Sequence, residues 1–246
     1  MKLFGIIGKP LDHSLSPKLF NAIFKNLKLP CRYLPFQVEK PHLKNLIVCM
    51  KLVDVFGLNV TTPYKRVVAP YLDKLDISAK RCGAVNTIVR RKNRFIGFNT
   101  DGEGFVNALW EKKKIRPKGK IVTIFGNGGA ARGIAAALAK GGAKKVHVLN
   151  RRRIRNAKKY LRTTDILIQA TSAQLTVPLS LLPKKAIVCD IVYHPRQTKL
   201  LHLANKKGFK TMDGLWMLIY QANLNLKLWT GKSIDINWLR KISLSG

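Results

Sequence analysis

Acidic residues are scarce in this 246-residue chain: 12 Asp and Glu stand against 46 Lys and Arg, and the formal net charge is +34. Such an excess of positive charge is typical of nucleic-acid-binding proteins. The basic residues are nevertheless spread along the whole chain, and no helix-turn-helix, zinc-finger or RNA-binding signature accompanies them. We therefore do not expect nucleic acid as the partner and assign the charge to solubility and attraction of anionic ligands. A non-catalytic protein that binds nucleic acid remains an alternative interpretation of this composition.

Closely spaced cysteines and long apolar runs are also lacking. The four cysteines are far apart in the sequence, at Cys31, Cys49, Cys82 and Cys189. This spacing favours thiols in a reducing compartment over a disulfide framework or a zinc site, and His194 and His202 lack a second ligand at metal-binding spacing. No apolar run approaches the ~18–20 residues of a membrane-spanning helix, and Pro10 interrupts the start too early for a secretory signal. We expect a cytoplasmic protein without a metal or a membrane partner.

Short apolar runs alternate with amphipathic stretches along the chain, in which 46% of the residues are hydrophobic. Strands are predicted at 3–8, 32–38, 55–60, 84–90, 94–99, 120–125, 146–149, 165–170 and 186–191. Helices are predicted from an N-cap at Ser16, at 43–52, 73–80 and 104–113, after the glycines as far as Lys140, and finally at 215–228. Strands that alternate with helices predict parallel sheets with ligands at the carboxyl ends of the strands. The change in pattern near 99–104 predicts two α/β domains.

A glycine-rich loop follows the predicted strand 120–125. The sequence Gly126-Asn127-Gly128-Gly129-Ala130-Ala131 fits the pattern G-x-G-x-x-A. In this pattern the first glycine permits a tight turn, the second lets the backbone approach a pyrophosphate, and the small last residue lets the helix pack on the sheet. The helix N-terminus then attracts the anion. Because a strand precedes the loop and a helix follows it, we interpret it as a dinucleotide site rather than as a simple turn.

The next predicted strand ends at Asn150, near where NAD-preferring proteins carry an Asp or Glu. This chain instead continues Asn150-Arg151-Arg152-Arg153-Ile154-Arg155. Guanidinium groups pair with the 2′-phosphate of NADP, which a carboxylate would repel. The sequence therefore favours NADP over NAD, although consecutive arginines also suit a solvated patch in a protein this basic.

Four short polar motifs lie at predicted strand ends and turns. They are SLSP at 14–17, NVTTPYK at 59–65, GAVNT at 83–87 and NTDG at 99–102. Singly, each has a structural explanation as a helix cap, a turn or a hinge. Together they supply hydroxyls, amides, one lysine and one carboxylate, which is a suitable set for binding a polyhydroxylated acid.

These motifs, the glycine loop, Asn150-Arg151 and the segment DGLWMLIYQ at 213–221 resemble the shikimate dehydrogenase family. The motifs occur in the family's order over nearly the whole chain. The resemblance implies reversible, NADPH-dependent reduction of 3-dehydroshikimate to shikimate, on the cytoplasmic route to aromatic amino acids. It also implies an N-terminal α/β substrate domain (1–101 with 214–246) and a Rossmann-type NADP-binding domain (102–213), with a C-terminal helix that returns to the first domain.

The resemblance also assigns roles to residues. Lys65 and Asp101 are implied to be catalytic. The residues implied to bind the substrate are Ser14, Ser16, Asn59, Thr61, Asn86, Tyr193 and Gln221. The residues implied to bind the cofactor are Gly126, Asn127, Gly128, Gly129, Ala130, Asn150, Arg151, Arg152, Arg155, Ile191 and Gly214.

The chemistry of Lys65 and Asp101 suits these roles. Hydride transfer to a ketone leaves an alkoxide, which an ammonium group can stabilise and protonate. A carboxylate can hold that ammonium in place and bind the neighbouring hydroxyl. We therefore expect the two side chains to act as one unit.

The sequence departs from the family at several points. The stretch 155–165 is short, so a helix or strand of the cofactor domain is expected to be missing there. Gln169, Asn127 and Arg152 replace the asparagine, alanine and threonine that are usual at their positions. A paralogue that takes quinate or prefers NAD remains an alternative, and the sequence leaves a monomer or a homodimer open.

Overall fold

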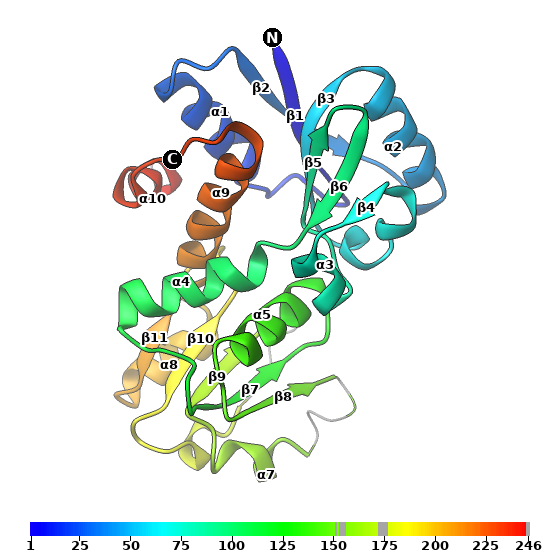
Figure 1. Cartoon of the computed structure of the whole chain (residues 1–246). Coiled ribbons are helices and arrows are strands. Elements are labelled where there is room, and N and C mark those ends of the chain that lie inside the picture. The colour runs from blue at the N-terminus through cyan, green and yellow to red at the C-terminus, as the bar shows by residue number, and fades with distance from the viewer. Residues whose placement is uncertain (151, 153–155, 172–176, 245–246) are drawn as a thin grey trace. The chain divides into compact units, whose positions relative to one another are not determined.

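The computed structural model describes residues 1–150, 152, 156–171 and 177–244. The chain divides into two compact units, coloured along the sequence in Figure 1. The first unit comprises Met1–Thr100 and Gln221–Gly246, and the second comprises Asp101–Tyr220. The domain limits expected from the sequence, at 101 and 214, stay a prediction, because this division describes packing rather than independent folding.

The first unit is built on a six-stranded mixed sheet with the strand order β2-β1-β3-β5-β6-β4. The strands are β1 (Lys2–Gly8), β2 (Cys31–Gln37), β3 (Val55–Val60), β4 (Lys74–Leu75), β5 (Thr87–Arg91) and β6 (Arg94–Phe98). β1 pairs in parallel with β2 and β3, whereas β5 runs antiparallel to β3 and β6. The sheet therefore presents the carboxyl ends of β1 and β3 beside the start of β5, and polar residues gather there.

The helices of this unit are α1 (Ser16–Asn26), α2 (Leu43–Leu52), α3 (Ile77–Cys82), α10 (Ile236–Leu244) and the part of α9 (Gly214–Thr230) that follows Tyr220. Short 3₁₀ turns occupy Lys40–His42, Tyr64–Arg66 and Ala69–Tyr71. Aromatic rings hold α1 and α9 against the sheet. The Phe20 ring stacks on the Tyr33 ring with 4.7 Å between the ring centroids, and the centroids of Trp229 and Phe20 are 5.0 Å apart. The Trp229 Nε1 group donates to the Ile88 carbonyl at 3.0 Å, which fixes the end of α9 against β5.

The second unit contains a five-stranded sheet in which every strand is parallel to its neighbours. The strands are β7 (Ile121–Phe125), β8 (Lys145–Leu149), β9 (Ile166–Gln169), β10 (Ile187–Asp190) and β11 (Lys210–Met212). The helices are α4 (Asp101–Lys113), α5 (Gly129–Lys140), α7 (Lys158–Leu161), α8 (Lys199–Lys206) and the beginning of α9, with a 3₁₀ turn at Leu179–Leu181. Two apolar cores, centred on Ile124 and Leu167, lie within this unit.

The strand order β8-β7-β9-β10-β11 corresponds to 2-1-4-5-6 of the doubly wound order 3-2-1-4-5-6. Within the described residues no strand pairs with the outer edge of β8, and α7 is the one regular element between 156 and 165. The position of strand 3 is thus absent from the described part of the chain, where the sequence is short. The order reverses between β7 and β9, and such a switch point is where open α/β sheets bind ligands.

Most predicted elements match the structure, and β3 and α2 have the predicted bounds. Two helix starts are wrong. Ser16 is the first residue of α1 rather than its N-cap, because Leu15 already has helical backbone angles; the Ser14 hydroxyl instead accepts the Ser16 N–H at 3.3 Å. α4 begins at Asp101 instead of 104, so the acidic residues Asp101 and Glu103 occupy its first turn.

Two other predictions of helices are also wrong. The helix predicted at 73–80 is divided into β4 and α3, because the Asp73 carboxylate accepts the Phe95 N–H of β6 and the Asp76 carboxylate caps α3. The helix at 215–228 is not the last: α10 follows, and its Trp238 N–H donates to Asp235. α7, α8 and β11 were not predicted.

We predict that Asp76→Ala destabilises the first unit. The Asp76 carboxylate accepts the N–H and the hydroxyl of Ser78 at 2.8 and 2.7 Å. Loss of an N-cap costs about 1 kcal/mol of unfolding free energy, so the thermal midpoint by circular dichroism should fall by about 2–4 °C. A fall no larger than that of Asp12→Ala, at an exposed site, would contradict the capping role.

The same substitution has a predicted pH dependence. Although burial opposes it, hydrogen bonds from Ser78 lower the pKa of Asp76 in the folded protein. The stability that Asp76 contributes is therefore present above the unfolded-state pKa of about 3.9 and is lost as the pH falls through the folded-state pKa. The difference between wild type and Asp76→Ala should be full at pH 7 and shrink below about pH 4.

Candidate active site

The lysine of the NVTTPYK motif is placed by backbone hydrogen bonds at the ends of β1 and β3. The Thr61 N–H donates to the Ile7 carbonyl at 2.9 Å, and the chain then turns into the 3₁₀ turn Tyr64–Arg66. The Lys65 carbonyl accepts the Val85 N–H at 2.7 Å, which joins this turn to the residue before Asn86. Lys65 is half-buried, and this backbone bond ties it to the segment that carries Asn86.

The start of α1 joins the same region through a buried tyrosine. Ser16 is buried, and its hydroxyl is hydrogen-bonded to that of Tyr33. The Tyr33 hydroxyl donates to Asn59 Oδ1 at 2.7 Å. Burial raises the pKa of Tyr33 well above its usual value, and the Ser16 bond offsets only part of this effect. Tyr33 is therefore a neutral donor that fixes Asn59, a role not predicted from its place in a strand pattern.

Asn86 lies at the centre of the cluster. Its carbonyl accepts the Val60 N–H at 2.8 Å and the Asn59 side-chain amide at 3.2 Å. Its own amide contacts Thr100 and, at 3.5 Å, Gln221 of α9. The structure thus brings Ser16, Asn59, Asn86 and Gln221 into one hydrogen-bonded set, and backbone bonds place Thr61 and Lys65 next to it. Ser14 lies just before α1 and is half-buried.

Two of the predicted site residues belong to the second unit. Asp101 is the residue after Thr100 and the first of α4, and it is 3% exposed. Tyr193 follows β10 and is half-buried. Asp101 is thus carried by α4, and Tyr193 by the segment after β10. That the two side chains lie close to Lys65 stays a prediction.

The glycine loop has the geometry that the sequence predicts. Gly126 has a φ of 118°, and a Cβ there would overlap the Ala170 carbonyl oxygen. Its N–H donates to Leu149 of β8 at 2.9 Å, so the loop leaves β7 at the switch point of the sheet. A Cβ on Gly128 would meet nothing within 4 Å, and α5 begins at Gly129. The loop therefore holds a tight turn and leaves open space before a helix N-terminus, as a bound pyrophosphate requires.

The loop also carries a polar pair. The exposed Asn127 accepts the Arg132 Nε–H group at 3.1 Å, which places a guanidinium group close to the first turn of α5. Asn150 directly follows β8 and is exposed, as is Arg152. Arg151 and Arg155 lie outside the described residues.

Ile191 and Gly214 meet at the carboxyl end of β10. A Cβ on Gly214 would overlap the Ile191 carbonyl, and the Gly214 N–H donates to the Val192 carbonyl at 3.2 Å. Just before them Asp190 is buried, and burial raises its pKa, although hydrogen bonds from the Val192 N–H and the Thr198 hydroxyl oppose this shift. These contacts fix the backbone at the carboxyl ends of the strands.

Comparison with known proteins identifies this arrangement. A family model of the shikimate dehydrogenase substrate-binding domain matches residues 6–88. A shikimate dehydrogenase (NADP(+)) of Pyrococcus furiosus is 40% identical over 99% of this chain and 96% of its own length. The chain belongs to the shikimate dehydrogenase family. This finding confirms the resemblance seen in the sequence.

Solved structures of the family share the fold. Shikimate 5-dehydrogenase of Thermus thermophilus, in complex with NADP(H) and shikimate, superposes with a TM-score of 0.89 at 32% identity, over 99% of this chain and 98% of that chain. The two-domain α/β fold class is therefore confirmed. A quinate dehydrogenase of Corynebacterium glutamicum in complex with NAD also superposes, with a TM-score of 0.88 at 28% identity over 100% and 99% of the two chains. Proteins named for different substrates, in complexes with different dinucleotides, therefore share this fold.

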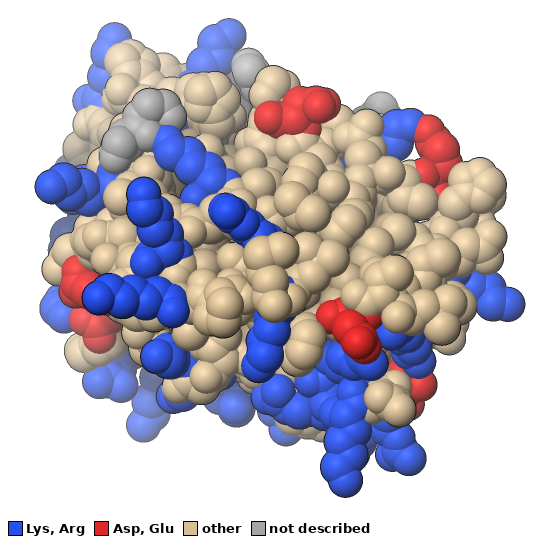
Figure 2. Space-filling view, turned by 90° about the horizontal axis from the view of Figure 1, so that it is seen from above, with Lys and Arg blue, Asp and Glu red and all other residues tan. Residues whose placement is uncertain are grey.

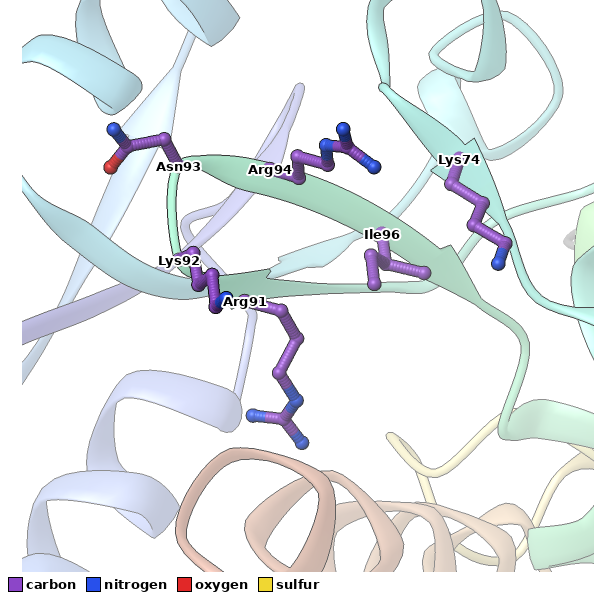
Figure 3. Close-up of a pocket in the computed structure, with 6 residues that line it drawn as sticks. All are labelled: Lys74, Arg91, Lys92, Asn93, Arg94 and Ile96. Atoms are coloured by element: carbon purple, nitrogen blue, oxygen red, sulfur yellow. The ribbon is translucent and has the colours of Figure 1, made fainter.

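A basic hollow lies away from the polar cluster of this family member. It has a volume of about 710 Å³ at the β5–β6 hairpin and is lined by Lys74, Arg91, Lys92, Asn93, Arg94 and Ile96 (Figure 3). The hairpin tip is at the opposite end of β5 from Asn86. Lysine and arginine side chains also gather on the left and lower parts of the face shown in Figure 2, whereas much of the rest of that face carries neither charge. Because no aromatic ring lines the hollow, it offers no stacking platform for a nucleic-acid base.

Two further findings concern metals and membranes. Within the described residues no group of three or more His, Cys, Asp or Glu side chains is arranged to hold a metal ion. No helix in that part of the chain is long and apolar enough to cross a bilayer. None of the four cysteines forms a disulfide.

We predict that two glycine substitutions in the loop differ in their effect on the thermal stability of the protein. Gly126→Ala forces a side chain into the left-handed region and against Ala170, so it should lower the thermal midpoint of the protein by several degrees. Gly128→Ala meets no protein atom and should leave the midpoint within about 1 °C of wild type. Thermal unfolding without ligand measures both, and equal midpoints for the two variants would refute the proposed turn geometry.

Proposed function

We propose that this chain catalyses the reversible, NADPH-dependent reduction of 3-dehydroshikimate to shikimate, with Lys65 and Asp101 handling the proton. The observation that carries the proposal is the buried set of Ser16, Asn59, Asn86 and Gln221 beside Lys65. Three amides, a hydroxyl and the neighbouring lysine match the groups of a polyhydroxylated acid. The class of enzyme, an NADP-dependent oxidoreductase, agrees with the relatives named shikimate dehydrogenase (NADP(+)).

The second unit supplies residues that fit a dinucleotide. The pyrophosphate would lie against Gly126, Gly128 and the N-terminus of α5, where the space is open. When bound, the cofactor supplies or accepts the hydride. The proposed cofactor residues are Gly126, Asn127, Gly128, Gly129, Ala130, Asn150, Arg151, Arg152, Arg155, Ile191 and Gly214.

The protein's own residues would manage the charge and the proton. As the carbonyl carbon gains a hydride, its oxygen becomes an alkoxide, which the Lys65 ammonium stabilises and protonates. In the reverse direction the neutral Lys65 amine takes the proton from the hydroxyl. Asp101 would hold the lysine and bind the neighbouring hydroxyl, so that loss of either residue leaves the other incorrectly placed.

The remaining substrate contacts follow from where the first unit places polar groups. Ser14 and Ser16 at the start of α1 would bind the carboxylate. Thr61, Asn86 and Gln221 would bind ring hydroxyls, with Asn59 held by Tyr33 behind them. Tyr193 would reach the substrate from the second unit.

Quinate is the second candidate substrate, because a quinate dehydrogenase that is 28% identical shares the fold. We propose a cytoplasmic enzyme acting as a monomer or a homodimer. Carboxylic acid substrates of this kind are anions, and the net charge of +34 would attract them and the cofactor at a distance.

We predict that Lys65→Ala lowers kcat for shikimate oxidation by about 10²–10⁴-fold, because it removes the proton donor and acceptor. NADPH absorbance gives the rate, and circular dichroism shows that the fold is retained. Arg66→Ala is the matched control, since Arg66 is the next residue in the same turn and is exposed. If both variants keep wild-type rates, the proposed mechanism fails; a nucleic-acid binder would show that indifference together with a steep salt dependence of binding.

We further predict a KM for NADP at least about tenfold lower than that for NAD, because a guanidinium–phosphate pair contributes roughly 1.5–3 kcal/mol. Steady-state assays of shikimate and quinate, each with both cofactors, test this and the choice of substrate together. Equal KM values for the two cofactors would remove the inference from Asn150-Arg151-Arg152-Arg153.

A further inference from the structure

Asn225 is a buried polar residue of α9 to which none of the motifs assigns a role. It is 0% exposed and lies one helical turn after Gln221. Its Nδ2 donates to Gln221 Oε1 at 2.9 Å. Its Oδ1 accepts the hydroxyls of Thr87 and Thr100, each at 2.7 Å. All hydrogen-bonding atoms of this side-chain amide thus face the polar cluster of the first unit.

A backbone donor fixes the direction of these hydrogen bonds. The Thr100 N–H can only donate, and it lies 2.8 Å from Asn86 Oδ1. The other end of the Asn86 amide is therefore Nδ2, which donates to Thr100 Oγ1 at 2.9 Å. The Thr100 hydroxyl has two acceptors within reach, Asn225 Oδ1 at 2.7 Å and Asn86 Oδ1 at 3.3 Å, and the shorter bond directs its proton to Asn225 Oδ1. Asn225 consequently turns its Nδ2 toward Gln221.

The oxygen of Gln221 is engaged as a result. Gln221 Oε1 receives Asn225 Nδ2 at 2.9 Å and faces Asn86 Nδ2 at 3.5 Å. Reversing the Gln221 amide would place its N–H groups against these two N–H donors. Each buried donor left without an acceptor destabilises the folded protein. Water does not compensate, because Asn86, Gln221 and Asn225 are all at most 8% exposed.

We propose that Asn225 is a positioning residue that holds Gln221 so that it acts on its ligand as a hydrogen-bond donor through Nε2. The substrate group at this point is then an acceptor, a ring hydroxyl oxygen or a carboxylate oxygen. This inference rests on the proposed role of Gln221 in binding shikimate. Asn225 itself touches no substrate; it acts through the amide orientation of Gln221.

The test uses Asn225→Asp, which has nearly the same shape. The carboxylate still accepts the Thr87 and Thr100 hydroxyls but places an oxygen where Nδ2 met Gln221 Oε1. The Gln221 amide should then reverse and present an oxygen to the substrate. We expect the KM for shikimate to rise about tenfold, the equivalent of one lost hydrogen bond, while the KM for NADP stays at the wild-type value.

The matched control is Asn223→Asp on the same helix. Asn223 Oδ1 accepts the Ile234 N–H at 3.0 Å, a bond that aspartate keeps, so this variant should retain the wild-type KM for shikimate. If buried aspartate at 225 prevents folding, Asn225→Ala serves instead. It frees the Gln221 amide to rotate, and a smaller rise in the same KM is expected.

A double-mutant cycle separates positioning from a merely structural role. In a Gln221→Ala background, Asn225→Asp should leave the KM for shikimate unchanged, because the amide that it orients is gone. A loss of the same size in both backgrounds overturns the proposal, as does an unchanged KM in the single variant. If the wild-type protein neither oxidises nor binds shikimate by calorimetry, the proposed function itself fails, and this inference fails with it.

Discussion

The hydrogen bonds of one buried amide, Asn86, organise the polar half of the first unit. Through its carbonyl Asn86 holds the end of β3, and through its side chain it holds Thr100 at the end of β6 and Gln221 on α9. These three elements are far apart in the sequence, and no apolar contact could fix their polar groups with the same directionality. Such a network stabilises the fold only when its members are satisfied, because an unpaired buried amide is costly. Because each buried amide must keep its hydrogen-bond partners, the network also determines which side-chain atoms face a ligand.

The second unit uses backbone geometry rather than side chains for the same purpose. The switch point lies between the neighbouring strands β7 and β9. There the positive φ of Gly126 lets the chain turn from the end of β7 into α5. The described sheet ends at β8, without a strand at position 3, yet the turn is held by bonds to Leu149 and between Ala170 and Phe125. The loop that we propose to bind the pyrophosphate is therefore held by β7, β8 and β9, which the described chain contains.

Several of the few carboxylates accept backbone N–H groups. Asp73 binds the N–H of Phe95, Asp76 caps α3, Asp165 binds the N–H of Ile121 and Asp190 binds that of Val192. Only a minority of the 46 basic residues can find a carboxylate partner among 12. The uncompensated positive charge is therefore a property of the surface, while the acidic residues fix joints in the fold. A field of this sign favours anionic ligands such as the proposed substrate and cofactor.

Local patterns determined much of this protein: the strand Val55–Val60, the helix Leu43–Leu52, the glycine loop and the motifs that contain Lys65, Asn86 and Asp101. Each depends on periodicity or on turn chemistry within a few residues, which a sequence displays directly. The bond from Phe95 to Asp73 that helps to divide 73–80, and the roles of Tyr33 and Asn225, were decided by tertiary structure alone. Tyr33 and Asn225 look like ordinary strand and helix residues until distant segments fold against them. A hydrogen bond across 26 or 138 positions, such as Tyr33 to Asn59 or Thr87 to Asn225, leaves no mark on the pattern of neighbouring residues.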